Sequence, residues 1–413
     1  MPIRSTGVRW LAGILLVGFA AIYIAASARL LMASRLSLRG DEQSLAKAAR
    51  LEPASAEYAN ILGRVRFFAL QDFVGGRHYL KEAVRLNPHN AVYWLDLASL
   101  EHASDNKPEM QRAIEAAMAA DPFNPDVSWE AANFFLATGQ NSRALPLFKV
   151  VLNTVDRGEL ALAAVWQASD GNVDKALSQA IPPTVEAHTA FLQYLLRQKQ
   201  EESAQKTWQH LLSITHVPLA SANEFVDHLI QSGQSERAMA VWNTTAQQDP
   251  SGASYVAREG SVLNGGFEEP LLNAGFDWHL SPPSGITAET DPTYFSNGHQ
   301  SLMISAKGFD GADFGVFQYV AVRPSTEYEL SLNMRSEDVH AAQGLRVAVD
   351  DAYSKQNLAS TDDRLETTPW RPSRVSFHSG TTTHLVVVRL ARQAGSGAME
   401  GKVWLDDIAL TQK

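Results

Sequence analysis

The hydrophobic period of this 413-residue chain changes once, near Tyr255, and that change limits the possible folds more than any other feature. From about residue 41 to 250, apolar residues recur at the 3.6-residue spacing of amphipathic helices. After Tyr255 they recur at every second position, in short runs separated by Gly, Pro, Asn, Ser or Asp. The sequence therefore predicts a helical region followed by an all-β region.

Prolines and glycines give the helical region a fixed period. The tripeptides LEP, LNP and ADP place Pro53, Pro88 and Pro122 at intervals of 35 and 34 residues. Within the units a Gly stands five residues before an Ala, as Gly139 does before Ala144. A Gly can end a first helix, a Pro can stop a second one, and a small Ala lets two helices approach closely. The region is predicted to be a series of helical hairpins.

This pattern resembles the tetratricopeptide repeat, a helical hairpin with a period of 34 residues. The positions that match best in two successive repeats are Trp94, Leu97, Ala98, Ala117 and Pro122, and then Ala132, Phe135, Gly139, Ala144 and Phe148. The resemblance implies an α-solenoid of about six hairpins over residues 41–255, four of them clear. It also implies a concave face that binds a partner protein.

Seven strand-like runs follow the solenoid, and together they predict an antiparallel β-sandwich. The runs are residues 301–306, 316–322, 327–334, 344–351, 373–379, 384–391 and 402–410. The irregular stretches 270–300 and 351–370 are expected to be loops over one rim of the sandwich.

Several motifs of the β region occur in a familiar order. They are NGGFE (264–268), NGHQSL (297–302), FQYVAVRPSTEYELSLNMR (317–335), TPWRPSRVSFHS (368–379) and VWLDDIAL (403–410). In this order they resemble the galactose-binding-like jelly roll of the carbohydrate-binding modules attached to xylanases and glucanases. The resemblance covers roughly residues 260–412 and implies a jelly-roll domain over residues 256–413.

The resemblance also implies a structural calcium site. Glu268 and one residue of the pair Asp406 and Asp407 would share Ca²⁺ with backbone carbonyl groups, because this ion prefers six to eight oxygen ligands. Strand alternation points the two aspartates to opposite faces, so only one can reach the site, and Asp406 is favoured. The alternative interpretation is that both aspartates are solvent-facing or capping carboxylates.

A sugar presents an apolar face and a ring of hydroxyl groups, so its binding site combines an aromatic platform with planar hydrogen-bonding groups. Alternation places Asn333 and Arg335 on the polar face of one predicted strand. The candidate hydrogen-bonding residues are Asn333, Arg335 and Arg346, and the candidate stacking platforms, expected on loops, are Tyr294, Phe309 and Phe314. The alternative for each is an ordinary surface or core residue.

The N-terminal segment bears on location. Residues 10–28 carry no charge, and as a helix they would extend about 28 Å, close to the hydrocarbon thickness of a bilayer. We therefore predict a membrane anchor and linker over residues 1–40. The tripeptide Ala26-Ser27-Ala28 also fits a signal-peptide cleavage site, so a cleaved segment remains the alternative. Arginines flank both ends and do not decide the orientation.

Composition and motifs exclude several classes of function. The formal net charge of −10 offers no extended basic surface for a nucleic acid, and the absence of cysteine excludes disulfides and thiolate chemistry. The sequence contains no G-x-S-x-G elbow, H-E-x-x-H helix or Walker loop. Asp362, Asp363 and Glu366 could form a carboxylate pair, but they lie in a polar loop where solvated carboxylates are expected. The sequence predicts a protein that is not an enzyme.

These observations favour a non-catalytic adaptor of a bacterial cell envelope. One helix would cross the inner membrane with the bulk of the chain outside the cytoplasm, or the protein would be secreted if that segment is cleaved. The solenoid would hold a partner protein and the jelly roll a polysaccharide, in exopolysaccharide or O-antigen assembly. Two alternatives stay open: a protein–protein scaffold that binds no sugar, and a polysaccharide-active enzyme with an unrecognised site.

Overall fold

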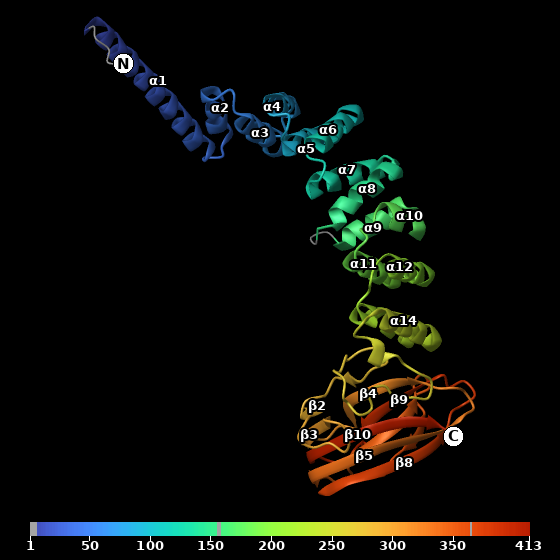
Figure 1. The fold of residues 1–413 in the computed structure, drawn as a ribbon. Helices are drawn as coiled ribbons and strands as arrows, with labels where there is room; N and C mark the ends of the chain where they lie inside the picture. Colours follow the sequence, from blue (N-terminus) through green and yellow to red (C-terminus); the bar gives the residue numbers. More distant parts are fainter. Residues whose placement is uncertain (1–5, 155–157, 364–365) are drawn as a thin grey trace. The chain divides into compact units, whose positions relative to one another are not determined.

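A computed structural model describes residues 6–154, 158–363 and 366–413 of the chain (Figure 1). The chain forms two compact units, Met1–Pro182 and Pro183–Lys413. The predicted order of helical hairpins followed by an antiparallel β-sandwich is confirmed. The predicted domain limits, 41–255 and 256–413, stay predictions.

The first unit is helical. Its elements are α1 (Thr6–Ser37), α2 (Glu42–Leu51), α3 (Ala56–Arg64), the π-helical turn η1 (Val65–Ala69), α4 (Phe73–Leu86), α5 (Ala91–Ala103), α6 (Lys107–Ala120), α7 (Pro125–Ala137), α8 (Asn141–Leu152), α9 (Gly158–Ala168) and α10 (Val173–Gln179). Small residues occupy the helix contacts, as predicted. Ala98, Ala117 and Ala144 are buried, and a Cβ on Gly63 would lie only 2.8 Å from Leu80 Cγ.

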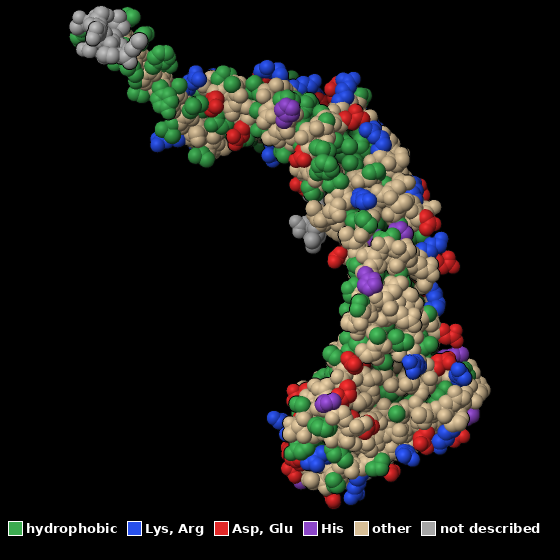
Figure 2. Space-filling view, in the orientation of Figure 1, with side chains coloured by type: hydrophobic (Ala, Val, Ile, Leu, Met, Phe, Trp, Pro, Cys, Tyr) green, Lys and Arg blue, Asp and Glu red, His purple; other side chains and the backbone are tan. Residues whose placement is uncertain are grey.

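Helix α1 differs from the other helices because its apolar side chains have nothing to pack against over most of its length. Hydrophobic side chains gather along its described part (Figure 2). Among the described residues, Trp10–Ser37 is the one helix whose length and hydropathy would let it cross a bilayer, and the apolar window is unburied. A signal sequence has the same properties, so the choice between an anchor and a cleaved segment stays open.

The second unit begins with four more helices and two short 3₁₀ turns. These are α11 (Val185–Arg197), α12 (Glu201–Ile214), η3 (Leu219–Ala222), α13 (Asn223–Gln231), α14 (Ser235–Gln248) and η4 (Ala253–Tyr255). Over the described residues, α3 to α14 pair in succession as α3–α4, α5–α6, α7–α8, α9–α10, α11–α12 and α13–α14. This series matches the predicted six hairpins.

Trp242 on α14 fills the contact between the last hairpin and the sandwich. It is fully buried, its ring lies 6.3 Å from that of Phe276, and its Nε1 donates to Tyr255 O at 2.7 Å. A Cβ on Gly275, which has φ +58°, would lie 2.3 Å from this ring, so the close approach requires glycine. The sandwich therefore covers the end of the helical stack, which a solenoid otherwise exposes to water.

Within the part of the chain that the structure describes, ten strands form two five-stranded antiparallel sheets. Sheet A has the order β1–β4–β9–β6–β7, and sheet B has the order β2–β3–β10–β5–β8. The strands are β1 (His279–Leu280), β2 (Ile286–Asp291), β3 (Ser301–Phe309), β4 (Asp313–Ala321), β5 (Glu327–His340), β6 (Arg346–Asp351), β7 (Asn357–Ser360), β8 (Thr368–His378), β9 (Leu385–Ala391) and β10 (Met399–Gln412). Side chains such as Leu302, Leu332, Val347, Val388 and Leu405 fill the space between the sheets.

All seven predicted strands are present, but the two stretches predicted as loops also contain strands. β1 and β2 lie within 270–300, and β7 lies within 351–370. Each of the three is short and forms the edge of a sheet. Short, partly polar edge strands lack the sustained alternation on which the prediction depended.

Candidate functional site

The outer face of sheet A carries aromatic and charged side chains. Alternation along β4 sends Val316 and Val320 into the core, so that Phe317 and Tyr319 face outward. Along β9 the same rule turns Arg389 outward. All three outward side chains are half-buried, although the outer face of a sandwich is usually well solvated.

Strand register places these residues in cross-strand rows, next to smaller side chains on the neighbouring strands. Phe317 on β4 pairs with Arg389 on β9, which pairs with Ala348 on β6. In the next row, Tyr319 pairs with Val387, and Val387 pairs with Asp350. The result is a groove of about 410 Å³. Its lining residues are Asp313, Phe317, Tyr319, Asp350, Asp351, Lys355, Val387 and Arg389.

One side of the groove is aromatic. The rings of His279 and Phe317 are stacked at 4.6 Å with an interplanar angle of 9°. Tyr319 meets both rings edge-on, at 5.6 Å from His279 and 5.4 Å from Phe317. His279 is itself fixed, because its Nε2 lies 3.0 Å from Gly275 O. This wall presents a rigid apolar surface to the groove.

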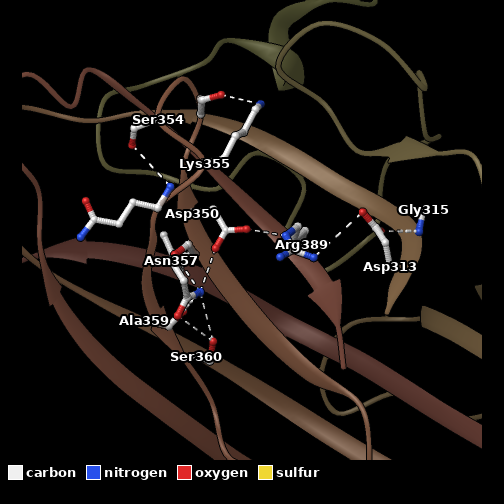
Figure 3. A network of polar contacts seen from close by, with 12 residues as sticks. Asp313, Gly315, Asp350, Ser354, Lys355, Asn357, Ala359, Ser360 and Arg389 are labelled. Atoms are coloured by element: carbon white, nitrogen blue, oxygen red, sulfur yellow. Dashed lines mark hydrogen bonds and ion pairs between the residues drawn. The ribbon is translucent and has the colours of Figure 1, made fainter. Parts of the chain in front are cut away.

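The other side is polar, and Arg389 lies at its centre (Figure 3). Its Nε donates to Asp350 Oδ2, and its Nη1 lies 4.0 Å from Asp313 Oδ2. The second oxygen of Asp350 accepts a hydrogen bond of 2.8 Å from Asn357 Nδ2. The guanidinium is therefore held between two carboxylates, which fixes a planar donor group in the groove.

The turn after β6 closes this polar side. Asp351 Oδ1 accepts hydrogen bonds from the backbone N–H groups of Tyr353 (2.9 Å) and Ser354 (2.7 Å). Burial opposes ionisation, but the hydrogen bonds from Thr383 and Ser354 outweigh it and lower the pKa of Asp351. Lys355 Nζ donates to Ala352 O at 2.6 Å. The turn is thus fixed by its own hydrogen bonds.

Arg346, predicted as a sugar-binding residue, also lies on the outer face of sheet A. It pairs with Ala391, which pairs with Asp313 at the end of the groove. Its Nε is buried and has no hydrogen-bond partner among the described residues. A buried donor without a partner is costly to the fold.

Of the other three candidates, Asn333 and Arg335 lie on β5 of sheet B, and Tyr294 lies in the loop after β2 that covers this sheet. The Arg335 guanidinium is 4.4 Å from the centre of the Tyr294 ring and 5.4 Å from that of Trp404. Trp404 is only 1% exposed, and its Nε1 donates to Asp291 Oδ2 at 2.7 Å. Asn333 Nδ2 donates to the Ser296 hydroxyl and to Asp407 Oδ2, both at 2.9 Å. These groups thus bond to or stack on one another.

Phe309 and Phe314 are not stacking platforms on loops. Phe309 is 7% exposed and Phe314 is fully buried, and their rings contact each other at 5.1 Å inside the sandwich. The expectation was wrong because β3 extends to Phe309 and β4 already begins at Asp313. Phe314 shares the inward face of β4 with Val316, and Phe309 turns inward at a β-bulge that shifts the pairing of β3 with β10.

The predicted site missed Phe317, Tyr319, Asp350 and Arg389. One signal was available in the run VFQYVAV, in which two aromatics occupy the positions opposite to the core valines. Aromatics on the solvent side of a strand are informative because water disfavours exposed rings. Alternation alone does not show which strands lie beside β4, so the polar side could not be found in this way.

The residues of the predicted calcium site come together at the loop 296–300. Asp406 is fully buried, and its Oδ2 accepts two backbone N–H groups of this loop, at 2.7 and 3.1 Å. Glu268 Oε1 accepts two more, at 2.8 and 3.4 Å. The NGG segment lies close by, because Ile408 N donates to Gly265 O at 2.9 Å. Burial is the main cause that raises the pKa of Asp406.

This donor set does not fit Ca²⁺ in its described arrangement. The ion needs oxygen ligands, whereas peptide N–H groups point at both Glu268 and Asp406. Asp407 Oδ2 is bonded by Asn333. Among the described residues, no three or more His, Asp or Glu side chains are placed to hold a metal ion. The calcium site stays a prediction.

Comparisons with known proteins give partial likenesses. No protein-family model matches the chain. Cellulose synthase operon protein C of Pseudomonas fluorescens (strain SBW25) is 27% identical over 122 residues, which are 26% of this chain and 10% of that protein. This chain thus spans a small part of the relative's length.

Two groups of solved structures are also similar. A CBM4 structure is 14% identical and covers 37% of this chain and 99% of its own, with a TM-score of 0.29. A tetratricopeptide repeat protein from Parabacteroides merdae is 14% identical and covers 54% of this chain and 93% of its own, with a TM-score of 0.31. Because these scores are below 0.5, the fold assignment depends on the helix pairing and strand order above.

Proposed function

We propose that this protein is a non-catalytic adaptor whose sandwich binds a polysaccharide in the groove of sheet A. The observation that carries the proposal is the composition of that groove. A rigid aromatic wall lies beside a fixed guanidinium and several carboxylates in one groove. The apolar face of a pyranose ring can stack on the wall while its hydroxyl groups meet the polar side.

Charge favours a neutral glycan. The groove is lined by three acids, Asp313, Asp350 and Asp351, and by two bases, Lys355 and Arg389. Arg389 is already paired with carboxylates, so little positive charge is left for a uronic acid or a sulfate. Neutral hydroxyl groups can accept from the guanidinium and donate to the carboxylates without changing this balance.

The proposed location is the bacterial cell envelope. Helix α1 would anchor the chain in the inner membrane, or serve as its export signal, with the sandwich outside the cytoplasm. The relative named cellulose synthase operon protein C makes a β-1,4-glucan the first glycan to test, and synthesis or export of an extracellular polysaccharide the first process.

The solenoid would hold a partner protein. In the first unit a hollow of about 580 Å³ lies between α5, α6 and α7, with Asn133 and the buried Phe134 in its lining. A photo-reactive residue at position 133 is expected to give a cross-linked product in cells. The same group at Arg112, which is exposed and outside this lining, is the control. Equal cross-linking at both positions would argue against the hollow as the partner's site.

The polysaccharide proposal is tested with the full chain in detergent micelles. The protein is applied to immobilised β-1,4-glucan, xylan, galactan and alginate, and binding to a neutral polysaccharide is expected. Phe317→Ala should abolish retention because it removes half of the stacked wall. Tyr294→Ala, an exposed aromatic on sheet B, is the matched control and should bind as the wild type does.

The same experiment separates the alternatives. A wild-type chain that binds no polysaccharide supports a protein–protein scaffold. The appearance of new reducing ends after incubation with any of these polysaccharides would support an enzyme. Loss of binding with Tyr294→Ala rather than with Phe317→Ala would move the site to sheet B.

A further inference from the structure

The groove of sheet A continues toward the last helical hairpin. A second hollow of about 280 Å³ adjoins it and shares two of its lining residues, Tyr319 and Lys355. Its other lining residues are Ile230 and Gln231 of α13, and Ala352 and Tyr353 of the β6–β7 turn. Helical residues therefore line the same depression as the sheet.

The hairpin is fixed against the sandwich. Asn243 on α14 exchanges two hydrogen bonds with the backbone of Ala257, at 2.9 and 2.8 Å. Asp227 on α13 accepts from Gly275 N at 3.3 Å. Together with the buried Trp242, these contacts hold α13 in a set position beside β4. A ligand in the groove would meet the helix without any rearrangement.

Tyr353 stands at the mouth of this second hollow. It is 39% exposed, although it is a large aromatic on a short turn. The turn holds it in place through the hydrogen bond from its own N–H to Asp351. Tyr353 also lines a third hollow, of about 350 Å³, together with the α13–α14 turn and His384. One ring thus borders both hollows.

We infer that the α13–α14 hairpin forms an outer subsite of the glycan site. In this subsite the Tyr353 ring stacks on a sugar residue, and the Gln231 amide donates to and accepts from its hydroxyl groups. Lys355 and Tyr319 lie where the two hollows meet and would contact the sugar at the junction. The inference rests on the proposed function, and it adds that the helical repeats take part in recognising longer glycans.

The experiment compares oligosaccharide lengths. Binding of cellotriose and of cellohexaose to the full chain in micelles is measured by isothermal titration calorimetry. The wild type should bind the hexaose more tightly than the triose. Tyr353→Ala and Gln231→Ala should each weaken hexaose binding about tenfold, equivalent to about 1.4 kcal/mol, and leave triose binding unchanged. Phe317→Ala should lose both ligands.

Two controls keep the result interpretable. Gln198, which directly follows α11 as Ser232 follows α13, is exposed and lines neither hollow, so Gln198→Ala should behave as the wild type. Thermal unfolding of each variant shows whether it is folded. The outer subsite would be overturned if both Tyr353→Ala and Gln231→Ala bound cellohexaose as tightly as the wild type does. It would also be overturned if these variants lost affinity for cellotriose and cellohexaose equally. A wild-type chain that binds neither oligosaccharide nor any polysaccharide of the panel would overturn the proposed function as well.

Discussion

The outer faces of the two sheets contain the same kinds of side chain and differ in what covers them. On sheet A, Phe317 pairs directly with Arg389 and Tyr319 pairs with Val387, and these residues line a groove. On sheet B, the Tyr294 ring and the Arg335 guanidinium cover Trp404 completely. An aromatic next to an arginine is therefore no evidence of a binding site until the chain's own loops are accounted for.

The loop after β2 is the cause of this difference. It brings Tyr294 onto Trp404 and places its backbone N–H groups on Asp406. On sheet A, the corresponding polar groups bond to neighbours within the sheet, as Asp350 does to Asn357 and Arg389. The sheet B cluster stabilises the fold, whereas the sheet A groove is available to a ligand.

The largest difference between the two sheets is expected in how far the loss of one aromatic side chain lowers the stability of the fold. Trp404→Ala removes a fully buried ring and is expected to destabilise the sandwich by about 3–5 kcal/mol. Phe317→Ala removes a half-buried ring and should cost about 1 kcal/mol. Thermal unfolding of the full chain, followed by near-ultraviolet circular dichroism, measures both. Equal losses would mean that the sheet A wall is as structural as the sheet B cluster.

A pair of arginine variants sharpens the comparison. Arg346→Met removes a guanidinium from the outer face of sheet A at the end of the proposed groove, together with a buried Nε that has no partner. The variant should therefore keep its Tm and lose about tenfold in affinity for cellohexaose. Arg335→Met removes a guanidinium that lies over two rings, so it should lower the Tm and leave the affinity unchanged. Calorimetric titration and thermal unfolding of both variants provide the check. If Arg335→Met lost affinity and Arg346→Met only lowered the Tm, the glycan would bind on sheet B.

These two arginines also show what the sequence could and could not predict. The helical hairpins and seven strands followed from periodicity, which is a local property. Arg335 and Arg346 lie on consecutive strands, β5 and β6, and both face outward. β5 joins sheet B and β6 joins sheet A, so the two residues lie on opposite faces of the sandwich. The pairing of strands that are distant in the sequence decides which sheet each strand joins. The local pattern of residues does not contain this information.

The hydrogen bonds that tie Glu268 and Asp406 to the loop 296–300 offer a smaller test. Backbone N–H groups satisfy Glu268 and Asp406, so the Tm is expected to be the same in EDTA and in millimolar CaCl₂. Glu268→Gln keeps an acceptor oxygen and should lower the Tm only slightly. A Tm that falls in EDTA, recovers with CaCl₂ and does not respond in Glu268→Gln would support the calcium ion that the sequence resemblance implies.

The smallest expected effect compares a buried acid beside each sheet. Asp406, on sheet B, has three backbone N–H donors, whereas Asp277, just before β1 of sheet A, is fully buried and its Oδ1 has no partner among the described residues. Burial raises the pKa of Asp277. The folded state therefore binds this proton more tightly than the unfolded state does, and stability falls as the pH rises from the unfolded pKa of about 3.9 through the raised folded value.

Asp277→Asn removes the charge and keeps an oxygen that can accept from Leu272 N. The variant should raise the Tm by a few degrees at pH 7, and the gain should shrink as the pH falls and disappear below about pH 4, where the wild-type carboxyl is protonated in both states. Burial raises the pKa of Asp406 too, but Asp406→Asn should lower the Tm at pH 7, because an amide cannot accept all three N–H groups. Thermal unfolding at several pH values measures both variants. A stabilising Asp406→Asn would show that the sheet B acid, like that of sheet A, is a net cost to the fold.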